Sequence, residues 1–202
     1  MSPFLILLAD YLIGGVPFGY LIVKLTTGQD VRASGSGNIG ATNVLRTTGR
    51  AAGVLTLALD VLKGLFAVWL MARFTSDSPL WTSLAALAVM AGHAFPLFLG
   101  FKGGKAVASF IGAFLYVAPL PLFAVLLVFV VVVAVSKYIS LGSVIAAGVF
   151  PLGVWLIMHP PAPVWIAATV AGAFIVYRHR ANIERIREGN ENVFSFKGKK
   201  AR

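Results

Sequence analysis

Apolar tracts of the length needed to cross a lipid bilayer recur along this chain, separated only by short polar segments. A membrane-spanning helix needs about 20 apolar residues. The tracts lie near residues 3–25, 51–71, 80–99, 106–118, 120–135, 141–158 and 164–177. The fourth and fifth form one apolar run, which we divide at Pro119 and Pro121 because proline stops a helix from continuing. The pattern predicts an all-α integral membrane protein with seven transmembrane helices.

Composition supports lipid rather than water as the main solvent of this chain. Hydrophobic residues make up 58% of the sequence and charged residues only 12%. A soluble domain carries about 25% charged residues. We therefore expect a single multi-span membrane domain that covers residues 1–202.

The basic residues indicate the orientation of the spans, because positively charged loops stay in the cytoplasm. With seven spans, fifteen of the seventeen Lys and Arg residues fall on one side. Arg73 falls on the other side, and Lys63 lies inside the second tract. We therefore expect the N-terminus outside and a basic cytoplasmic tail at residues 178–202. The net charge of +10 suits anionic membrane lipid; nucleic acid is not expected, because the basic residues are interleaved with apolar tracts.

Metal and thiol chemistry find no support in the sequence. The chain has no cysteine, which excludes disulfides and thiolate nucleophiles. Its three histidines, His93, His159 and His179, are scattered without a zinc-binding spacing. We expect neither a metal nor a cofactor.

The first polar loop, residues 26–50, combines glycines with polar side chains suited to an anion. Glycine lets backbone N–H groups approach a phosphate closely. The glycines match G-x-G-x-x-G, but a dinucleotide fingerprint follows a β-strand, and here a membrane span precedes. The candidate phosphate-binding side chains are Ser36, Asn38, Asn43 and Arg46. A flexible polar connector is the alternative.

The second loop ends in Gly103-Gly104-Lys105, at the start of the fourth span. It resembles the end of a nucleotide-binding P-loop, but Ala106 replaces the required Ser or Thr. The N-terminus of a helix attracts anions, and Lys105 adds a point charge. We expect Gly103, Gly104 and Lys105 to bind phosphate. His93, within the third span, is expected to form a packing hydrogen bond.

The head of the tail carries His179 and Asn182, which share one face if the segment is helical. His179 and Glu184 lie five positions apart, which is poor geometry for a His–carboxylate dyad. A basic segment that contacts anionic lipid is the alternative, and it fits residues 197–202 better. Within the second span, Asp60 and Lys63 are expected to form a structural ion pair rather than a proton relay.

Taken together, three segments resemble the bacterial membrane family of acyl-phosphate:glycerol-3-phosphate acyltransferases. They are residues 36–46 (SGNIGATNVLR), 92–105 (GHAFPLFLGFKGGK) and 179–191 (HRANIERIREGNE). All three fall on the expected cytoplasmic face, and the resemblance extends along nearly the whole chain. It implies a seven-span fold in the bacterial inner membrane, with the active site facing the cytoplasm.

The resemblance also implies residue roles. Ser36, Arg46 and Lys105 would bind phosphate groups, while His179 and Asn182 would orient glycerol 3-phosphate. The turn before Lys105 would accommodate the acyl phosphate.

The resemblance further implies that Glu191 is structural.

An acyl phosphate is an activated mixed anhydride, so positioning and electrostatic stabilisation can supply most of the catalysis without a covalent nucleophile. The first two loops hold no unpaired carboxylate, which suggests that the donor's own phosphate takes the hydroxyl proton, with His179 as its rival. A transporter for phosphate or an organic anion and a lipid-binding scaffold are the competing functions. Transporter sites lie near the bilayer midplane, often between repeats, whereas the candidate groups here gather at one face.

Overall fold

The computed structural model describes residues 2–194, and every regular element within that range is a helix. The prediction of an all-α protein is therefore confirmed. The last basic residues of the expected tail, from Lys197 onward, lie outside the described residues. The helices are α1 (Pro3–Gly15), α2 (Phe18–Thr27), η1 (Val31–Ala33), α3 (Ala41–Thr47), α4 (Arg50–Thr75), α5 (Pro79–Ala94), η2 (Leu97–Leu99), α6 (Val107–Val117), α7 (Pro119–Ser136), α8 (Ile139–Met158), α9 (Ala162–Arg178) and α10 (Arg180–Arg187).

Five segments of the described chain are long and apolar enough to cross a membrane: 3–27, 50–75, 79–99, 119–136 and 139–158. Two further apolar helices, α6 and α9, are shorter. The proline pair after Ala118 does separate two helices, because α6 ends at Val117 and α7 begins at Pro119.

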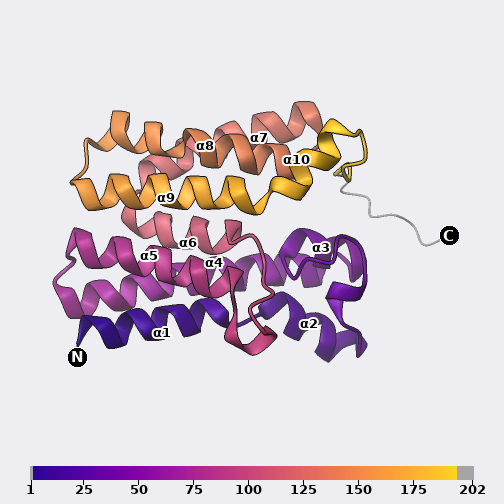
Figure 1. The fold of residues 1–202 in the computed structure, drawn as a ribbon, viewed down its shortest axis with the longest axis horizontal. Coiled ribbons are helices and arrows are strands. Elements are labelled where there is room, and N and C mark those ends of the chain that lie inside the picture. Colours follow the sequence, from indigo (N-terminus) through magenta and orange to yellow (C-terminus); the bar gives the residue numbers. More distant parts are fainter. Residues whose placement is uncertain (1, 195–202) are drawn as a thin grey trace.

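The helices form two groups that lie side by side (Figure 1). One group contains α1, α4, α5 and α6; the other contains α7, α8 and α9, and the groups meet chiefly where α5 packs on α9. The short elements α2, α3 and α10 gather at one end of the molecule, opposite the N-terminus. We call this the loop end.

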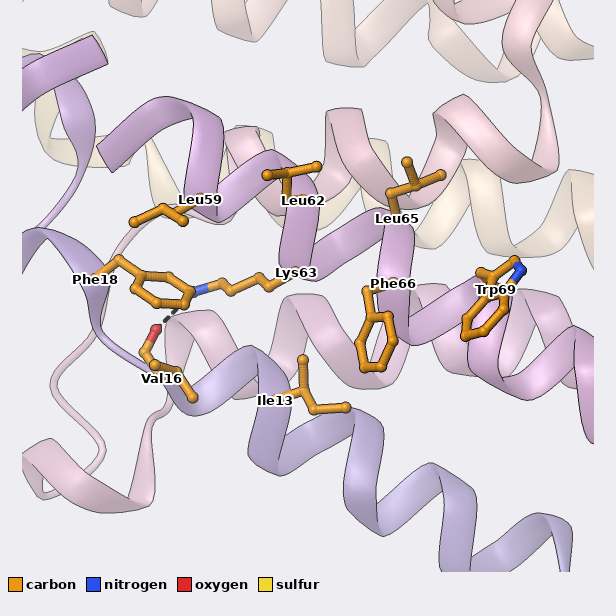
Figure 2. Close-up of a pocket in the computed structure, with 9 residues that line it drawn as sticks. All are labelled: Ile13, Val16, Phe18, Leu59, Leu62, Lys63, Leu65, Phe66 and Trp69. Carbon is orange, nitrogen blue, oxygen red and sulfur yellow. Dashed lines mark hydrogen bonds between the residues drawn. The ribbon is translucent and has the colours of Figure 1, made fainter. Parts of the chain in front are cut away.

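The first span differs from the continuous helix expected over residues 3–25. It breaks at Val16 and Pro17, so that α1 ends at Gly15 and α2 begins at Phe18. Proline has no backbone N–H and forces the preceding residue out of the helical conformation. The Val16 carbonyl freed by the break accepts a hydrogen bond of 2.9 Å from Lys63 Nζ, as Figure 2 shows.

Two helix boundaries and one loop also differ from the sequence-based expectations. The third span ends as an α-helix at Ala94, because Pro96 follows and the chain turns into η2. The first polar loop contains a helix, α3, which carries both Asn43 and Arg46. The second span extends further than expected, to Thr75.

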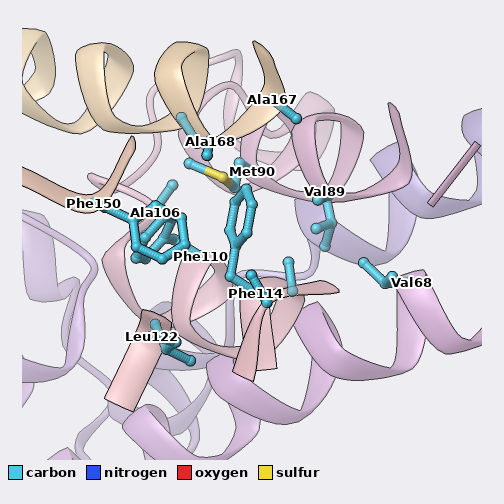
Figure 3. Close-up of a cluster of buried hydrophobic side chains, with 14 of the residues drawn as sticks. Val68, Val89, Met90, Ala106, Phe110, Phe114, Leu122, Phe150, Ala167 and Ala168 are labelled. Atoms are coloured by element: carbon cyan, nitrogen blue, oxygen red, sulfur yellow. The ribbon is translucent and has the colours of Figure 1, made fainter. Parts of the chain in front are cut away.

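Glycines allow the helices of the first group to approach each other closely. A Cβ atom at Gly64 would overlap the Ser109 carbonyl, and one at Gly112 would overlap the Val61 carbonyl, so α4 and α6 meet backbone to backbone. Small residues at helix interfaces provide such packing in membranes, where apolar lipid gives helices little hydrophobic reason to associate. Between the two groups lies a buried core that includes Phe110, Phe114 and Phe150 (Figure 3).

Asp60 and Lys63 form an ion pair of 2.7 Å, and both side chains are buried. We predict that Lys63→Met destabilises the protein by about 3–5 kcal/mol, because the Asp60 carboxylate and the Val16 carbonyl lose a shared buried partner. Thermal unfolding in detergent measures the change.

The control is Lys102→Met, which removes an exposed ammonium and should leave the unfolding midpoint within error. The double variant Lys63→Met with Asp60→Asn should regain part of the loss, since no buried charge is left unpaired. Equal midpoints for Lys63→Met and Lys102→Met would contradict the prediction.

Candidate functional site

A cavity of about 450 Å³ opens at the loop end, between the two helix groups. The three segments singled out in the sequence all contribute to its wall, although they lie far apart in the chain. Its predicted site residues are Ser36, Asn38, Asn43, Arg46, Lys105, His179, Asn182 and Glu191. Asp60 and His93 add a buried polar patch from α4 and α5. The rest of the wall is mainly apolar.

Asn43 organises the first loop from within. Its side-chain amide donates to the carbonyls of Val31, Ser34 and Asn38 at 2.9–3.2 Å, and its Oδ1 accepts from the backbone N–H of Ser36 at 2.8 Å. The side chain is buried. Asn43 was expected to donate to a phosphate, but its amide hydrogens are already used by the loop backbone. The loop is therefore held in one shape rather than being a loose connector.

This shape presents three side chains along the cavity wall. Ser36 follows the glycine turn that Asn43 holds, and Asn38 fixes the start of α3 by accepting from Gly40 N–H at 2.8 Å. Arg46, on α3, also lines the cavity and is partly buried. These are hydroxyl, amide and guanidinium donors, the groups from which phosphate sites are built.

The Gly103-Gly104 turn lies behind the cavity rather than on its wall. Gly103 N–H donates to the Ala94 carbonyl at 3.2 Å and Gly104 N–H to the His93 carbonyl at 3.1 Å. The N–H groups expected to face an anion are thus bonded to the end of α5. A Cβ at Gly104 would overlap the His93 ring, so glycine is needed for close approach.

Arg178 fixes the same turn from the other helix group. Its Nη2 donates to the Gly104 carbonyl at 2.8 Å and to the Gly103 carbonyl at 3.2 Å. Its guanidinium also lies over the Phe95 ring, 5.2 Å from the centroid. The sequence analysis missed this role, although Arg178 stands next to His179 and is the first cation after the seventh apolar tract.

Lys105 lies at the centre of a network that joins three parts of the chain. Its ammonium donates to Asn182 Oδ1, and the Asn182 amide donates to Glu191 Oε1 at 2.8 Å. Glu191 also accepts from Ser140 at 3.0 Å and from Arg185 at 2.8 Å. Ser140 was not singled out in the sequence; its position at the start of an apolar tract, on the side of the basic loops, was the available signal.

Burial lowers the pKa of Lys105 to about 8, and the neighbouring arginines Arg185, Arg178 and Arg46 act in the same direction, while Glu191 opposes them. Below that pH the ammonium is charged and available to an anion. The cavity thus places two cations, Lys105 and Arg46, in surroundings that are poorly hydrated, where their attraction for an anion is stronger than in water.

His179 is held neutral and in one tautomer. Burial, followed by the charge of Lys105, lowers the pKa of His179 to about 4. Its Nδ1 lies 2.8 Å from the Ile175 carbonyl, which only accepts, so we assign the ring proton to Nδ1. The other ring nitrogen, Nε2, is then a hydrogen-bond acceptor.

The long apolar helices and the cavity that joins cations to an apolar wall define an integral membrane protein with a site suited to a phosphate-bearing ligand. The profile of the glycerol-3-phosphate acyltransferase family matches residues 4–189. The chain belongs to this family.

Similar proteins cover nearly the whole chain. A glycerol-3-phosphate acyltransferase of Geobacter sulfurreducens is 47% identical over 184 residues, which make up 91% of this chain and 93% of the relative. One of Geotalea daltonii is 43% identical over 193 residues, 96% of this chain and 98% of the relative.

Solved structures extend the comparison to the fold. The crystal structure of PlsY, an integral membrane glycerol 3-phosphate acyltransferase, in its glycerol 3-phosphate form gives a TM-score of 0.90 at 39% identity, with 96% of each chain covered. Its lysophosphatidic acid form gives 0.87 at 37% identity, with 97% of each chain covered. The fold is therefore that of a multi-pass membrane acyltransferase.

Proposed function

We propose that this protein transfers a fatty acyl group from acyl phosphate to glycerol 3-phosphate, giving lysophosphatidic acid and phosphate. One observation carries the proposal: a single cavity joins the cations Arg46 and Lys105 to a wall of apolar side chains. Such a cavity suits two phosphate head groups beside one hydrocarbon chain. Family membership supports the acyltransferase reaction, and no observation favours the transporter.

The predicted polar side chains that line the cavity each have a proposed role. Arg46 and Lys105 neutralise the two phosphates, which otherwise repel each other, and Ser36 and Asn38 add hydrogen-bond donors. Asn182 keeps Lys105 in place because it accepts from the ammonium.

Four predicted site residues act through others. Asn43 shapes the first loop, and the lack of side chains at Gly103 and Gly104 lets this turn pack directly against His93. Glu191 holds Asn182 and thus acts as a structural residue.

The reaction needs no covalent enzyme intermediate. The glycerol hydroxyl oxygen attacks the acyl carbonyl carbon, the carbon–oxygen bond to phosphate breaks, and phosphate leaves with the electron pair. The hydroxyl proton moves to the departing phosphate. His179 accepts a hydrogen bond from the hydroxyl and orients it, because a group with a pKa of about 4 is a weak base at neutral pH.

We further propose that the chain is one domain with seven spans, its N-terminus outside and the loop end at the cytoplasmic surface of the bacterial inner membrane. The five long apolar segments and the shorter α6 and α9 support the count. The basic loops support the orientation.

Single cysteines test this orientation directly, because the natural chain has none. Lys102→Cys and Glu188→Cys should react with a membrane-impermeant reagent from the cytoplasmic side only, and Asp77→Cys from the outer side only. Labelling of positions 102 and 188 from opposite sides would refute the proposed site.

Purified protein should use acyl phosphate as donor and should not use acyl-CoA or acyl carrier protein. Arg46→Ala and Lys105→Ala should each lower turnover by at least about a hundredfold, the cost of one electrostatic contact to the reacting groups. Arg73→Ala removes an exposed cation from the end of α4 that lies away from the loop end; it is the matched control and should retain activity. Near-normal rates in both site variants, with the protein folded, would refute the assignment.

His179→Ala should weaken glycerol 3-phosphate binding and lower turnover only modestly, because the ring orients the hydroxyl rather than removing its proton. Steady-state kinetics separate the two effects in KM and kcat. A turnover loss of about 10²–10⁴ at unchanged substrate affinity would identify His179 as a general base instead.

A further inference from the structure

The lining of the apolar part of the cavity ends partway along four of its helices. Counting away from the loop end, the last lining residues are Asp60 on α4, Ile111 on α6, Leu122 on α7 and Ala147 on α8. From Ile139 to Ala147 the α8 wall is about 12 Å deep at 1.5 Å per residue, and from Gly53 to Asp60 the α4 wall is about 10 Å deep. The cavity therefore has a floor.

Three packed phenylalanine rings lie at that floor, with Phe110 in front of the other two. Phe110 lines the cavity, whereas Phe114 and Phe150 lie one helical turn beyond the last lining residues of α6 and α8 and are fully buried. Each pair of the three rings has a centroid distance of 4.9 Å, and Phe150 meets the other two nearly edge-on. Figure 3 shows Phe110 and Phe150 against each other within the buried cluster.

The rings cannot easily move aside. Interlocked aromatic side chains in a close-packed interior have few alternative rotamers, and small changes of volume there are felt. A hydrocarbon chain that enters from the cationic end therefore meets a rigid stop at Phe110, whereas the α4 wall is open at its side, where Val54 and Leu57 are 60% and 44% exposed.

We propose that the ring cluster of Phe110, Phe114 and Phe150 sets the upper limit on the acyl chains that the protein transfers efficiently. This inference rests on the proposed function, because it takes the acyl chain of the donor as the occupant of the apolar cavity. The charged end fixes where the chain starts, and the rings fix where it stops.

Variants on both sides of the floor test the proposal. Phe150→Leu replaces a ring with a smaller side chain and should extend the range of accepted chains. Ala147→Leu adds volume at the end of the cavity and should lower the longest chain length that is accepted. The full-length protein in lipid is assayed with a homologous ladder of saturated acyl phosphates, and kcat/KM is compared across the ladder. For the first chain beyond the limit, we expect rates to change on the order of tenfold, as a methylene misfit does in an apolar pocket.

Ala58→Leu is the matched control, because it adds the same atoms on an exposed face of α4 outside the cavity lining, and it should keep the wild-type profile. Ile111→Phe adds volume at the level of the floor from a partly exposed position, so it decides the matter if the buried variants fail to fold. Ile111→Phe should also lower the longest acyl-chain length that is accepted.

Two failures are distinguishable. If the wild type and all folded variants show the same dependence of kcat/KM on acyl-chain length, the ring cluster does not limit the chain and this proposal fails. If the wild type uses acyl phosphate of no length, the proposed function itself fails.

Discussion

The carboxamide of Asn182 joins the two helix groups at the loop end. It accepts from the Lys105 ammonium, which precedes α6 of one group, and donates to Glu191, which in turn accepts from Ser140 of α8 in the other. Both ends of the amide are thus engaged, and the position of the cation depends on the relative position of the groups. A partly satisfied buried network would be worse than an apolar contact, so this link constrains the site as a whole.

Hydropathy and charge were enough to predict the class of fold and the segments that meet. The apolar tracts are covered by helices, and the three polar segments do line one cavity. What the sequence could not distinguish is whether a polar group faces a ligand or the protein backbone. Asn43 and the Gly103-Gly104 turn have the composition of an anion site, yet their hydrogen bonds are made internally. Buried polar groups take whatever partner is near, and that partner is set by tertiary structure.

The break in the first span illustrates a different limit. Pro17 was visible in the sequence, but the hydropathy of a tract says nothing about its continuity. The break is stable because a buried lysine from α4 reaches the free Val16 carbonyl, a contact 47 positions away in the chain. Non-helical backbone at membrane depth is tolerated where protein satisfies it. Lys63 thus has two partners, and only one of them, Asp60, was suggested by the sequence.

The fixed tautomer of His179 has a consequence for the oxidation level of the acceptor substrate. With its proton directed to the Ile175 carbonyl, the imidazole offers the cavity only a lone pair. An alcohol can satisfy that lone pair, whereas a carbonyl oxygen in place of the reacting hydroxyl would bring two lone pairs together. Sites built to bind a hydroxyl reject analogues that lack it, because a buried polar group is left without a partner. One hydrogen bond at the end of α9 would thereby tell glycerol 3-phosphate from an analogue whose reacting hydroxyl is oxidised to a carbonyl.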